Sequence, residues 1–285
     1  MLSVLDLFRV GIGPSSSHTV GPIRIANRFA AALADGNVLG LVERIEVELQ
    51  GSLALTGAGH ATPKAVVLGL LRMEPETLDP DKADAMVADV YTAKDLRLAD
   101  GRVIPFDPET DIVFAYHVLP DLHPNGMKLS AYGANGDVLV EETYYSVGGG
   151  FIATAKQLST PPEDDIVKAG NQVPYPFASA AELLGICADK GMAIHEVILT
   201  NEDAMRPRAE TEAALDRIAD VMLACIDRGL VHEGILPGGL KVRRRAPEIW
   251  AKLQASPQSN EREQIFDWLN AYAMAVNEEN AGGGQ

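Results

Sequence analysis

The 285-residue chain is 47% hydrophobic and carries 24 Lys and Arg against 40 Asp and Glu, a formal net charge of -16. A chain of this length can bury a sizeable core, and we expect two domains. Nucleic-acid phosphates and anionic lipids repel its negative charge, and no apolar run reaches bilayer length, so we expect neither nucleic-acid nor membrane binding. The N-terminus lacks the residue order of a signal peptide, which predicts a cytoplasmic protein.

The first half of the chain alternates helix and strand signals. Helix starts are predicted where proline can occupy the first turn, at Pro22, at Pro63 with Thr62 as N-cap, and at Pro80 after Asp79. Alternating polarity and turn dipeptides predict strands within residues 45–49, 96–106, 111–117, 127–132 and 138–145. This order predicts an α/β domain with a mixed sheet over residues 1–156.

The second half has a different character. Residues 157–176 are rich in proline and polar side chains and predict a linker, and helical periods dominate residues 178–189, 211–228 and 261–279. We therefore expect residues 177–285 to form the start of an all-α domain, which makes the fold class α+β. Cys187 and Cys225 lie far apart on apolar helical patterns, so we expect two buried cysteines and no disulfide.

Residues 11–22 read GIGPSSSHTVGP and gather hydroxyl groups just before a predicted helix. Helix N-termini favour anions, so a carboxylate is a natural ligand for Ser15, Ser16, Ser17 and the backbone beside His18. The segment lacks the lysine of a phosphate-binding loop, which disfavours a nucleotide. A capping loop without a ligand is the alternative.

A second histidine, His60, lies in the segment LTGAGHATPK, between glycines and the helix predicted at Pro63. The ordinary pKa of histidine, about 6.5, suits a general base. A lone histidine is more often structural, but two in glycine-rich loops that each precede a helix favour function. Farther on, Asn125-Gly126 predicts a turn, and the glycines after Ser146 predict either a close approach to a ligand or a hinge into the linker.

Seven segments in order along the chain resemble the bacterial iron–sulfur L-serine dehydratases: GIGPSSSHTVGP, GSLALTGAGH, HPNGM, YYSVGGGF, VPYPF, ACIDRG and AVNEENA. The resemblance implies an N-terminal domain similar to the allosteric substrate-binding domain of certain phosphoglycerate dehydrogenases, followed by an all-α catalytic domain. It implies deamination of L-serine to pyruvate and ammonia, in amino-acid degradation and gluconeogenesis, with a [4Fe–4S] cluster as Lewis acid and without pyridoxal phosphate.

The same resemblance implies roles for individual residues. His60 is the leading base and His18 a second catalytic candidate; substrate-binding candidates are Ser15, Ser16, Ser17, Thr62, Asn125 and Ser146. Members of the family continue past AVNEENA, where their cluster cysteines lie, so we expect this chain to be incomplete and to hold no metal ligand itself. A homodimer is also expected.

Two other functions compete with the lyase. A non-catalytic module that senses serine or another small carboxylate would use the same loop without turnover. A hydrolase with Ser17 as nucleophile is disfavoured, because sequence neighbours seldom form a nucleophile–base pair and the sequence shows no acid to orient His18.

Overall fold

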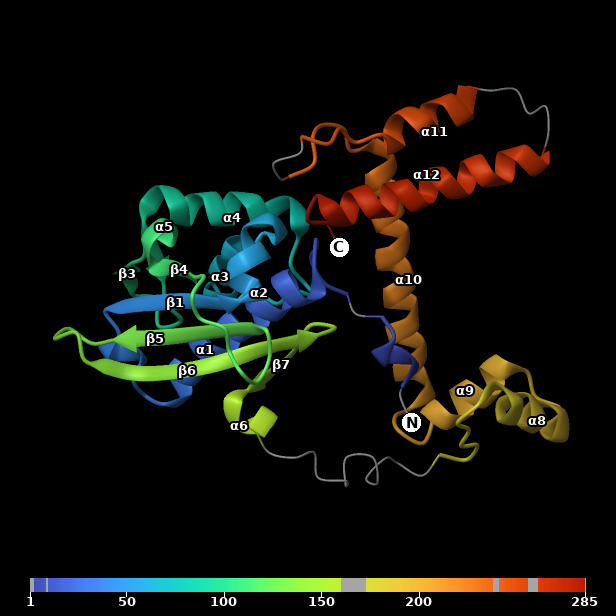
Figure 1. Cartoon of the computed structure of the whole chain (residues 1–285). Coiled ribbons are helices and arrows are strands. Elements are labelled where there is room, and N and C mark those ends of the chain that lie inside the picture. Colours follow the sequence, from blue (N-terminus) through green and yellow to red (C-terminus); the bar gives the residue numbers. More distant parts are fainter. Residues whose placement is uncertain (1–2, 9, 160–172, 238–240, 256–260, 285) are drawn as a thin grey trace. The chain divides into compact units, whose positions relative to one another are not determined.

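A computed structural model describes residues 3–8, 10–159, 173–237, 241–255 and 261–284 (Figure 1). The chain divides into two compact units. The larger contains residues 10–159 and 224–285, and the smaller contains residues 1–9 and 160–223. Among the described residues, none of the helices combines the length and the apolar character needed to cross a bilayer.

Helices and strands alternate in the larger unit before residue 160. The helical segments are η2 (Ser16–Val20), α1 (Gly21–Asp35), η3 (Leu39–Leu41), α2 (Ser52–Thr56), η4 (Gly57–His60), α3 (Thr62–Leu70), α4 (Pro80–Ala93), α5 (Pro108–Asp111) and α6 (Ala155–Ser159). The strands are β1 (Arg44–Gly51), β2 (Asp95–Arg97), β3 (Val103–Pro105), β4 (Ile112–Ala115), β5 (Asn125–Tyr132), β6 (Val138–Gly148) and β7 (Phe151–Thr154).

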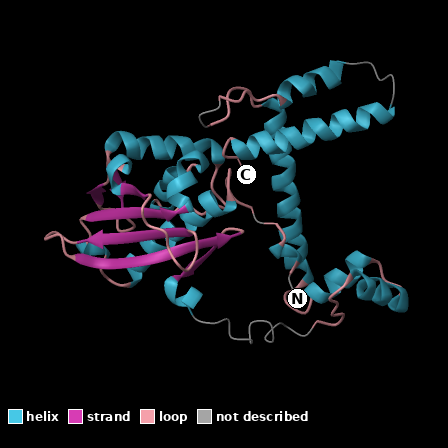
Figure 2. Cartoon of the chain, viewed as in Figure 1, coloured by secondary structure: helices cyan, strands magenta, loops and turns pink. Residues whose placement is uncertain are grey.

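The strands form a five-stranded sheet in the order β4-β1-β5-β6-β7 and a separate β2-β3 hairpin (Figure 2). The β1–β4 pair is parallel and the other pairs are antiparallel, so the predicted mixed sheet and the α+β class are confirmed. The glycines after Ser146 do not form a hinge into a linker. Gly148, Gly149 and Gly150 have φ values of 97°, 57° and 74° and make the tight β6–β7 turn, a conformation that favours glycine.

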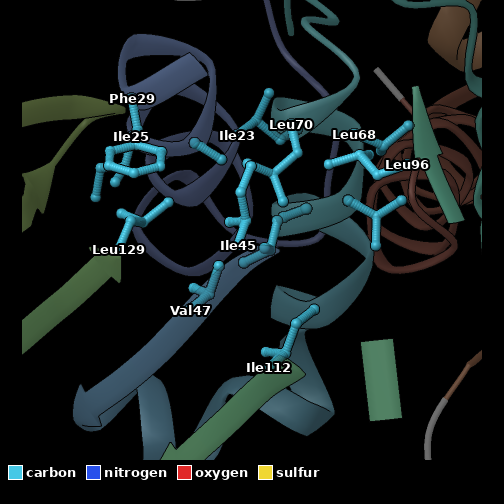
Figure 3. Packing of buried hydrophobic residues seen from close by; sticks show 14 of the residues in the cluster. Ile23, Ile25, Phe29, Ile45, Val47, Leu68, Leu70, Leu96, Ile112 and Leu129 are labelled. Atoms are coloured by element: carbon cyan, nitrogen blue, oxygen red, sulfur yellow. The ribbon is translucent and has the colours of Figure 1, made fainter. Parts of the chain in front are cut away.

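The core lies between one face of this sheet and the helices α1 and α3 (Figure 3). Phe29 from α1, Leu68 from α3, Val47 from β1 and Leu129 from β5 are all fully buried, as the apolar periodicity of these segments predicts. The two helices approach closely at Gly69, where a β-carbon would lie 2.6 Å from that of Ala26. This packing fixes the positions at which α1 and α3 begin.

Two helix starts were predicted from their capping residues, with different outcomes. Asp79 caps α4 as predicted, because its carboxylate accepts from the amide of Asp81 at 3.1 Å. The prediction that Thr62 caps α3 is wrong. Ala61, with a left-handed φ of 56°, occupies the cap position, and Thr62 is the first residue of the helix. The hydroxyl of Thr62 is thereby free for a tertiary hydrogen bond.

Helices build the later part of the larger unit. It contains the end of α10 (Arg208–Val231), α11 (Ala246–Ala255) and α12 (Glu261–Ala281). The Glu278 carboxylate accepts from the amides of Arg245 and Ala246 and so caps α11. Glu279 is 3% exposed and binds Arg228, His232 and Arg244 at about 3 Å each. Burial alone would raise the pKa of Glu279, but hydrogen bonds from these three partners outweigh it and lower the pKa.

The smaller unit contains η1 (Val4–Asp6), α8 (Ala180–Lys190), α9 (Ile194–Glu202) and the start of α10. The fully buried carboxylate of Glu202 accepts from the Ser3 hydroxyl at 2.8 Å and pairs with Arg206, which attaches the N-terminal segment to α9. Most of the predicted linker, residues 160–172, lies outside the described residues. The predicted boundaries at 156 and 177 therefore stay a prediction.

The two cysteines differ in their surroundings. Cys225 in α10 is buried as predicted, whereas Cys187 in α8 is only half-buried, so the prediction is wrong for that residue. Burial raises the pKa of the Cys225 thiol, and Glu279 adds to the effect while Arg228 opposes it. This thiol is held in its protonated form more strongly than an ordinary cysteine.

Candidate active site

The first predicted loop folds into a tight helical turn. Ser15 caps the turn: its hydroxyl accepts from the His18 amide at 3.1 Å, and its carbonyl accepts from the amides of Thr19 and Val20. The turn, η2, has π-helical geometry, which occurs frequently at functional sites, and it continues directly into α1. The turn places the His18 ring beside a second loop, near Ser52 and Thr56.

That second loop carries His60 and runs from α2 through η4 into α3. Two buried threonines join the loops reciprocally. The Thr19 hydroxyl donates to the His60 carbonyl at 2.9 Å, and the Thr62 hydroxyl donates to the His18 carbonyl at 2.7 Å. The centres of the two imidazole rings consequently lie 4.9 Å apart. The structure thus brings together the two histidines that the sequence singled out 42 residues apart.

The hydrogen bonds of His60 define which ring nitrogen carries its proton. Nδ1 lies 2.9 Å from the carbonyl oxygen of Thr56. A carbonyl can only accept, so the neutral ring donates from Nδ1 and leaves the lone pair on Nε2. The side chain is half-buried at the surface of the unit. A neutral imidazole with an available nitrogen in this setting can accept a proton from a ligand.

His18 has a more crowded environment. Its Nδ1 lies 2.9 Å from the Ser17 hydroxyl, and its Nε2 lies 3.1 Å from the Ser52 hydroxyl and 3.0 Å from the Thr56 hydroxyl. Burial lowers the pKa of His18, the neighbouring His60 lowers it further, and hydrogen bonding with Ser52 acts in the opposite direction. His18 is therefore neutral at neutral pH.

The other predicted residues fall into two groups. Ser15, Ser17 and Thr62 surround the histidine pair, and Ser16 lies exposed on the same turn. Asn125 and Ser146 form the second group, in which Asn125 Nδ2 donates to the Ser146 carbonyl at 3.0 Å. Both are buried, and the Ser146 hydroxyl has no hydrogen-bond partner among the described residues.

The Asn125–Ser146 pair adjoins the start of α1, where Gly21 has no room for a β-carbon beside the Ser146 hydroxyl. Asn125 and Gly126 begin β5, so the turn predicted for them is wrong. The structure shows Thr62 and Asn125 in hydrogen bonds that hold the backbone. Their predicted contact with substrate stays a prediction.

Sequence reasoning missed two residues of the site. Ser52 and Thr56 both contact His18, and the only signal for them was their spacing of four on a short helix, which places both on one face. It also did not predict that the segment at and after the end of α12 lies beside the first loop. The Gly13 amide donates to the Gly284 carbonyl at 2.8 Å, and the Gly13 backbone abuts Asn280. The segments GIGPSSSHTVGP and AVNEENAGGG are therefore neighbours in the folded chain.

The donor groups of the described residues do not suit a metal ion or cluster. Within the described part of the chain, no three His, Cys, Asp or Glu side chains are grouped to hold a metal ion. An iron–sulfur cubane needs several thiolates, whereas this sequence has two cysteines, and Cys225 has a raised thiol pKa. The described residues thus do not fit a [4Fe–4S] cluster by themselves.

Comparison with known proteins defines the family. The serine dehydratase beta chain model matches residues 3–157, and the serine dehydratase alpha chain model matches residues 189–285. The chain therefore belongs to the serine dehydratase family. It is 44% identical over 284 residues to the L-serine dehydratase of Streptomyces coelicolor and 42% identical over 288 residues to L-serine dehydratase 1 of Escherichia coli.

These alignments cover 100% of the chain but 61% and 62% of the two relatives. The L-serine dehydratase of Mycobacterium tuberculosis is 44% identical over 285 residues, and the alignment covers 60% of its length. The chain thus spans about three fifths of the length of the curated relatives that it matches.

Proposed function

We propose that the protein acts in the dehydration and deamination of L-serine to pyruvate and ammonia. Loss of the Cα proton and the β-hydroxyl removes one water and leaves 2-aminoacrylate, whose imine form is then hydrolysed to pyruvate and ammonia. Family membership and relatives named L-serine dehydratase support the substrate. The observation that carries the chemistry is the contact of His60 Nδ1 with the Thr56 carbonyl, which makes Nε2 the ring nitrogen available to a ligand.

His60 is the proposed general base. The Cα proton of serine is a weak acid, so its removal needs a base with a pKa near the working pH that is held in one orientation. The Thr56 carbonyl fixes the ring of His60, and the Thr19 hydroxyl fixes its backbone. In this proposal Nε2 takes the Cα proton of a serine bound beside the histidine pair.

The turn at Ser15–Ser17 is the proposed site for the substrate carboxylate. The first amides of a helical turn lack intrahelical acceptors, and η2 begins with Ser16 and Ser17. The hydroxyls of Ser15 and Ser16 add donors on the same turn, and Ser17 lies beside them with its hydroxyl against His18. Amides and hydroxyls of this kind suit a carboxylate.

The [4Fe–4S] cluster that the resemblance implies receives no ligand in this proposal, because the described residues do not fit it, and no step is derived through it. The homodimer rests on the resemblance and the cytoplasmic location on the N-terminal sequence, and both remain proposals. Light scattering of the purified protein measures the oligomeric state.

The test is turnover of L-serine by the complete natural protein, purified without oxygen, with pyruvate measured. We expect His60→Ala to lower kcat by about 10²–10⁴-fold, the usual contribution of a general base. His195→Ala, on the exposed surface of α9, is the matched control and should keep normal turnover. Near-normal turnover by His60→Ala would remove His60 from this role. Stoichiometric binding of L-serine without pyruvate formation by the wild-type protein would favour the sensing module instead.

A further inference from the structure

One residue outside the predicted site contacts both histidines. Thr56, the last residue of α2, presents its carbonyl oxygen to His60 Nδ1 at 2.9 Å and its hydroxyl to His18 Nε2 at 3.0 Å. Its backbone and its side chain thus bind different rings. The tautomer of each ring follows from what each group of Thr56 can donate or accept.

The hydroxyl of Thr56 has a single proton, and a second acceptor claims it. Thr56 Oγ1 lies 2.9 Å from the carbonyl oxygen of Ser52, one helical turn earlier, which can only accept. The hydroxyl proton therefore points to Ser52, and the oxygen lone pairs face His18. A proton on His18 Nε2 matches these lone pairs, and the Ser52 hydroxyl, 3.1 Å from the same nitrogen, then serves as a second acceptor.

The opposite nitrogen of His18 fits this assignment. With the proton on Nε2, Nδ1 carries the lone pair and accepts from the Ser17 hydroxyl at 2.9 Å. That bond occupies the only unprotonated nitrogen of His18. His60 has the reverse arrangement, with Nδ1 donating to the Thr56 carbonyl and Nε2 available.

We propose that Thr56 is a positioning residue that holds His18 and His60 in complementary tautomers, so that His60 alone presents a free basic nitrogen. The proposal rests on the proposed function, and it decides which of the two histidines is the base. It also assigns a role to His18. Because His18 Nδ1 accepts a hydrogen bond from the Ser17 hydroxyl, the Ser17 oxygen is left as an acceptor for a donor group of the substrate, such as the ammonium of serine.

Histidine tautomers can be observed directly. In the 285-residue chain labelled with 15N-histidine, long-range proton–nitrogen spectra distinguish protonated from unprotonated ring nitrogens, and His18→Gln and His60→Gln assign the signals. We expect Nε2–H on His18 and Nδ1–H on His60. An Nδ1–H tautomer on His18 in the wild-type chain would overturn the proposal, and this measurement requires no variant of Thr56 to fold.

Substitution of Thr56 separates the effect of its hydroxyl from that of its backbone carbonyl. Thr56→Val removes the hydroxyl and keeps the carbonyl, so the His18 nitrogen signals should shift while those of His60 stay. Thr56→Ser keeps the hydroxyl and should restore the wild-type spectrum. Unchanged His18 signals in Ser52→Ala/Thr56→Val, in which both hydroxyl acceptors are gone, would refute the positioning role.

A kinetic measurement links the tautomers to the reaction. In the complete natural protein we expect Thr56→Val to lower kcat about tenfold with little change in KM, comparable to one ordinary hydrogen bond, and Thr56→Ser to recover it. If the proposed function is wrong, the wild-type protein will not turn over serine, although its histidines can still show the assigned tautomers. If this inference is wrong, the tautomers will differ from those assigned, whether or not serine is turned over. Unaltered kcat in a Thr56→Val protein that turns over serine would contradict the link.

Discussion

Gly69 is the position where the packing that places the two histidine loops can be tested by one methyl group. Gly69 lies in α3 and packs against α1, the helix that follows the His18 turn. A β-carbon at residue 69 would overlap the carbonyl oxygen of Ile23 and lie 2.6 Å from the β-carbon of Ala26. Neither atom belongs to the end of a flexible side chain, so α1 and α3 must move apart to accept Gly69→Ala.

Two effects of opposite sign determine the result. Alanine in a helix interior is favoured over glycine by about 1 kcal/mol. Overpacking of a well-packed core costs about 1–3 kcal/mol, and a clash with backbone lies at the upper end of that range. We therefore expect Gly69→Ala to lower the free energy of unfolding by about 2 kcal/mol. Because α1 and α3 carry the loops, the distance between the His18 and His60 rings should change as well.

Gly185 in α8 provides the matched control, because it also lies inside a helix but has open space where a β-carbon would be built. Gly185→Ala should raise stability by about 0.5–1 kcal/mol through the propensity term alone. Urea unfolding followed by circular dichroism measures the free energies, and hydrogen exchange assigns each change to α3 or α8. A Gly69→Ala protein as stable as wild type would show that the α1–α3 contact is looser than the structure has it.

Two further predictions concern charge. Glu279→Gln leaves Arg228, Arg244 and His232 without their carboxylate. The free energy of unfolding, measured with urea, should fall by about 3 kcal/mol, at the lower end for a broken buried ion pair because Arg228 and His232 reach solvent. A loss under about 1 kcal/mol would contradict the buried network. For His18, a folded-state pKa below the ordinary 6.5 means that the unfolded chain binds the proton more readily, so its contribution to stability is present above about pH 6.5 and is lost as pH falls below it. The stability difference between wild type and His18→Gln should therefore shrink between about pH 7.5 and 5.5, and a difference that grows on acidification would reverse the sign of the pKa shift.

Much of the local structure followed from the sequence, because it depends on neighbours along the chain. Proline at the first turn and the Asp79 cap predicted where α1 and α4 begin, and alternating polarity predicted β1. Local patterns also identified His18 and His60, since both stand in glycine-rich loops ahead of a helix. The same reasoning failed at Thr62, whose composition suits a cap, because the hydrogen bond that its hydroxyl makes lies across the fold at His18.

Only the tertiary structure determined which groups of the site contact one another. The approach of the two rings, the reciprocal threonine bonds and the contact of Thr56 with His18 join segments that are far apart in sequence. The Asn125–Ser146 pair and the approach of Gly13 to Gly284 arise in the same way. Periodicity and capping describe which face of a segment is apolar and where the segment begins, but a hydrogen bond between two loops depends on the packing of the helices behind them. The residue types were present in the sequence, whereas the direction of each proton was set by the fold.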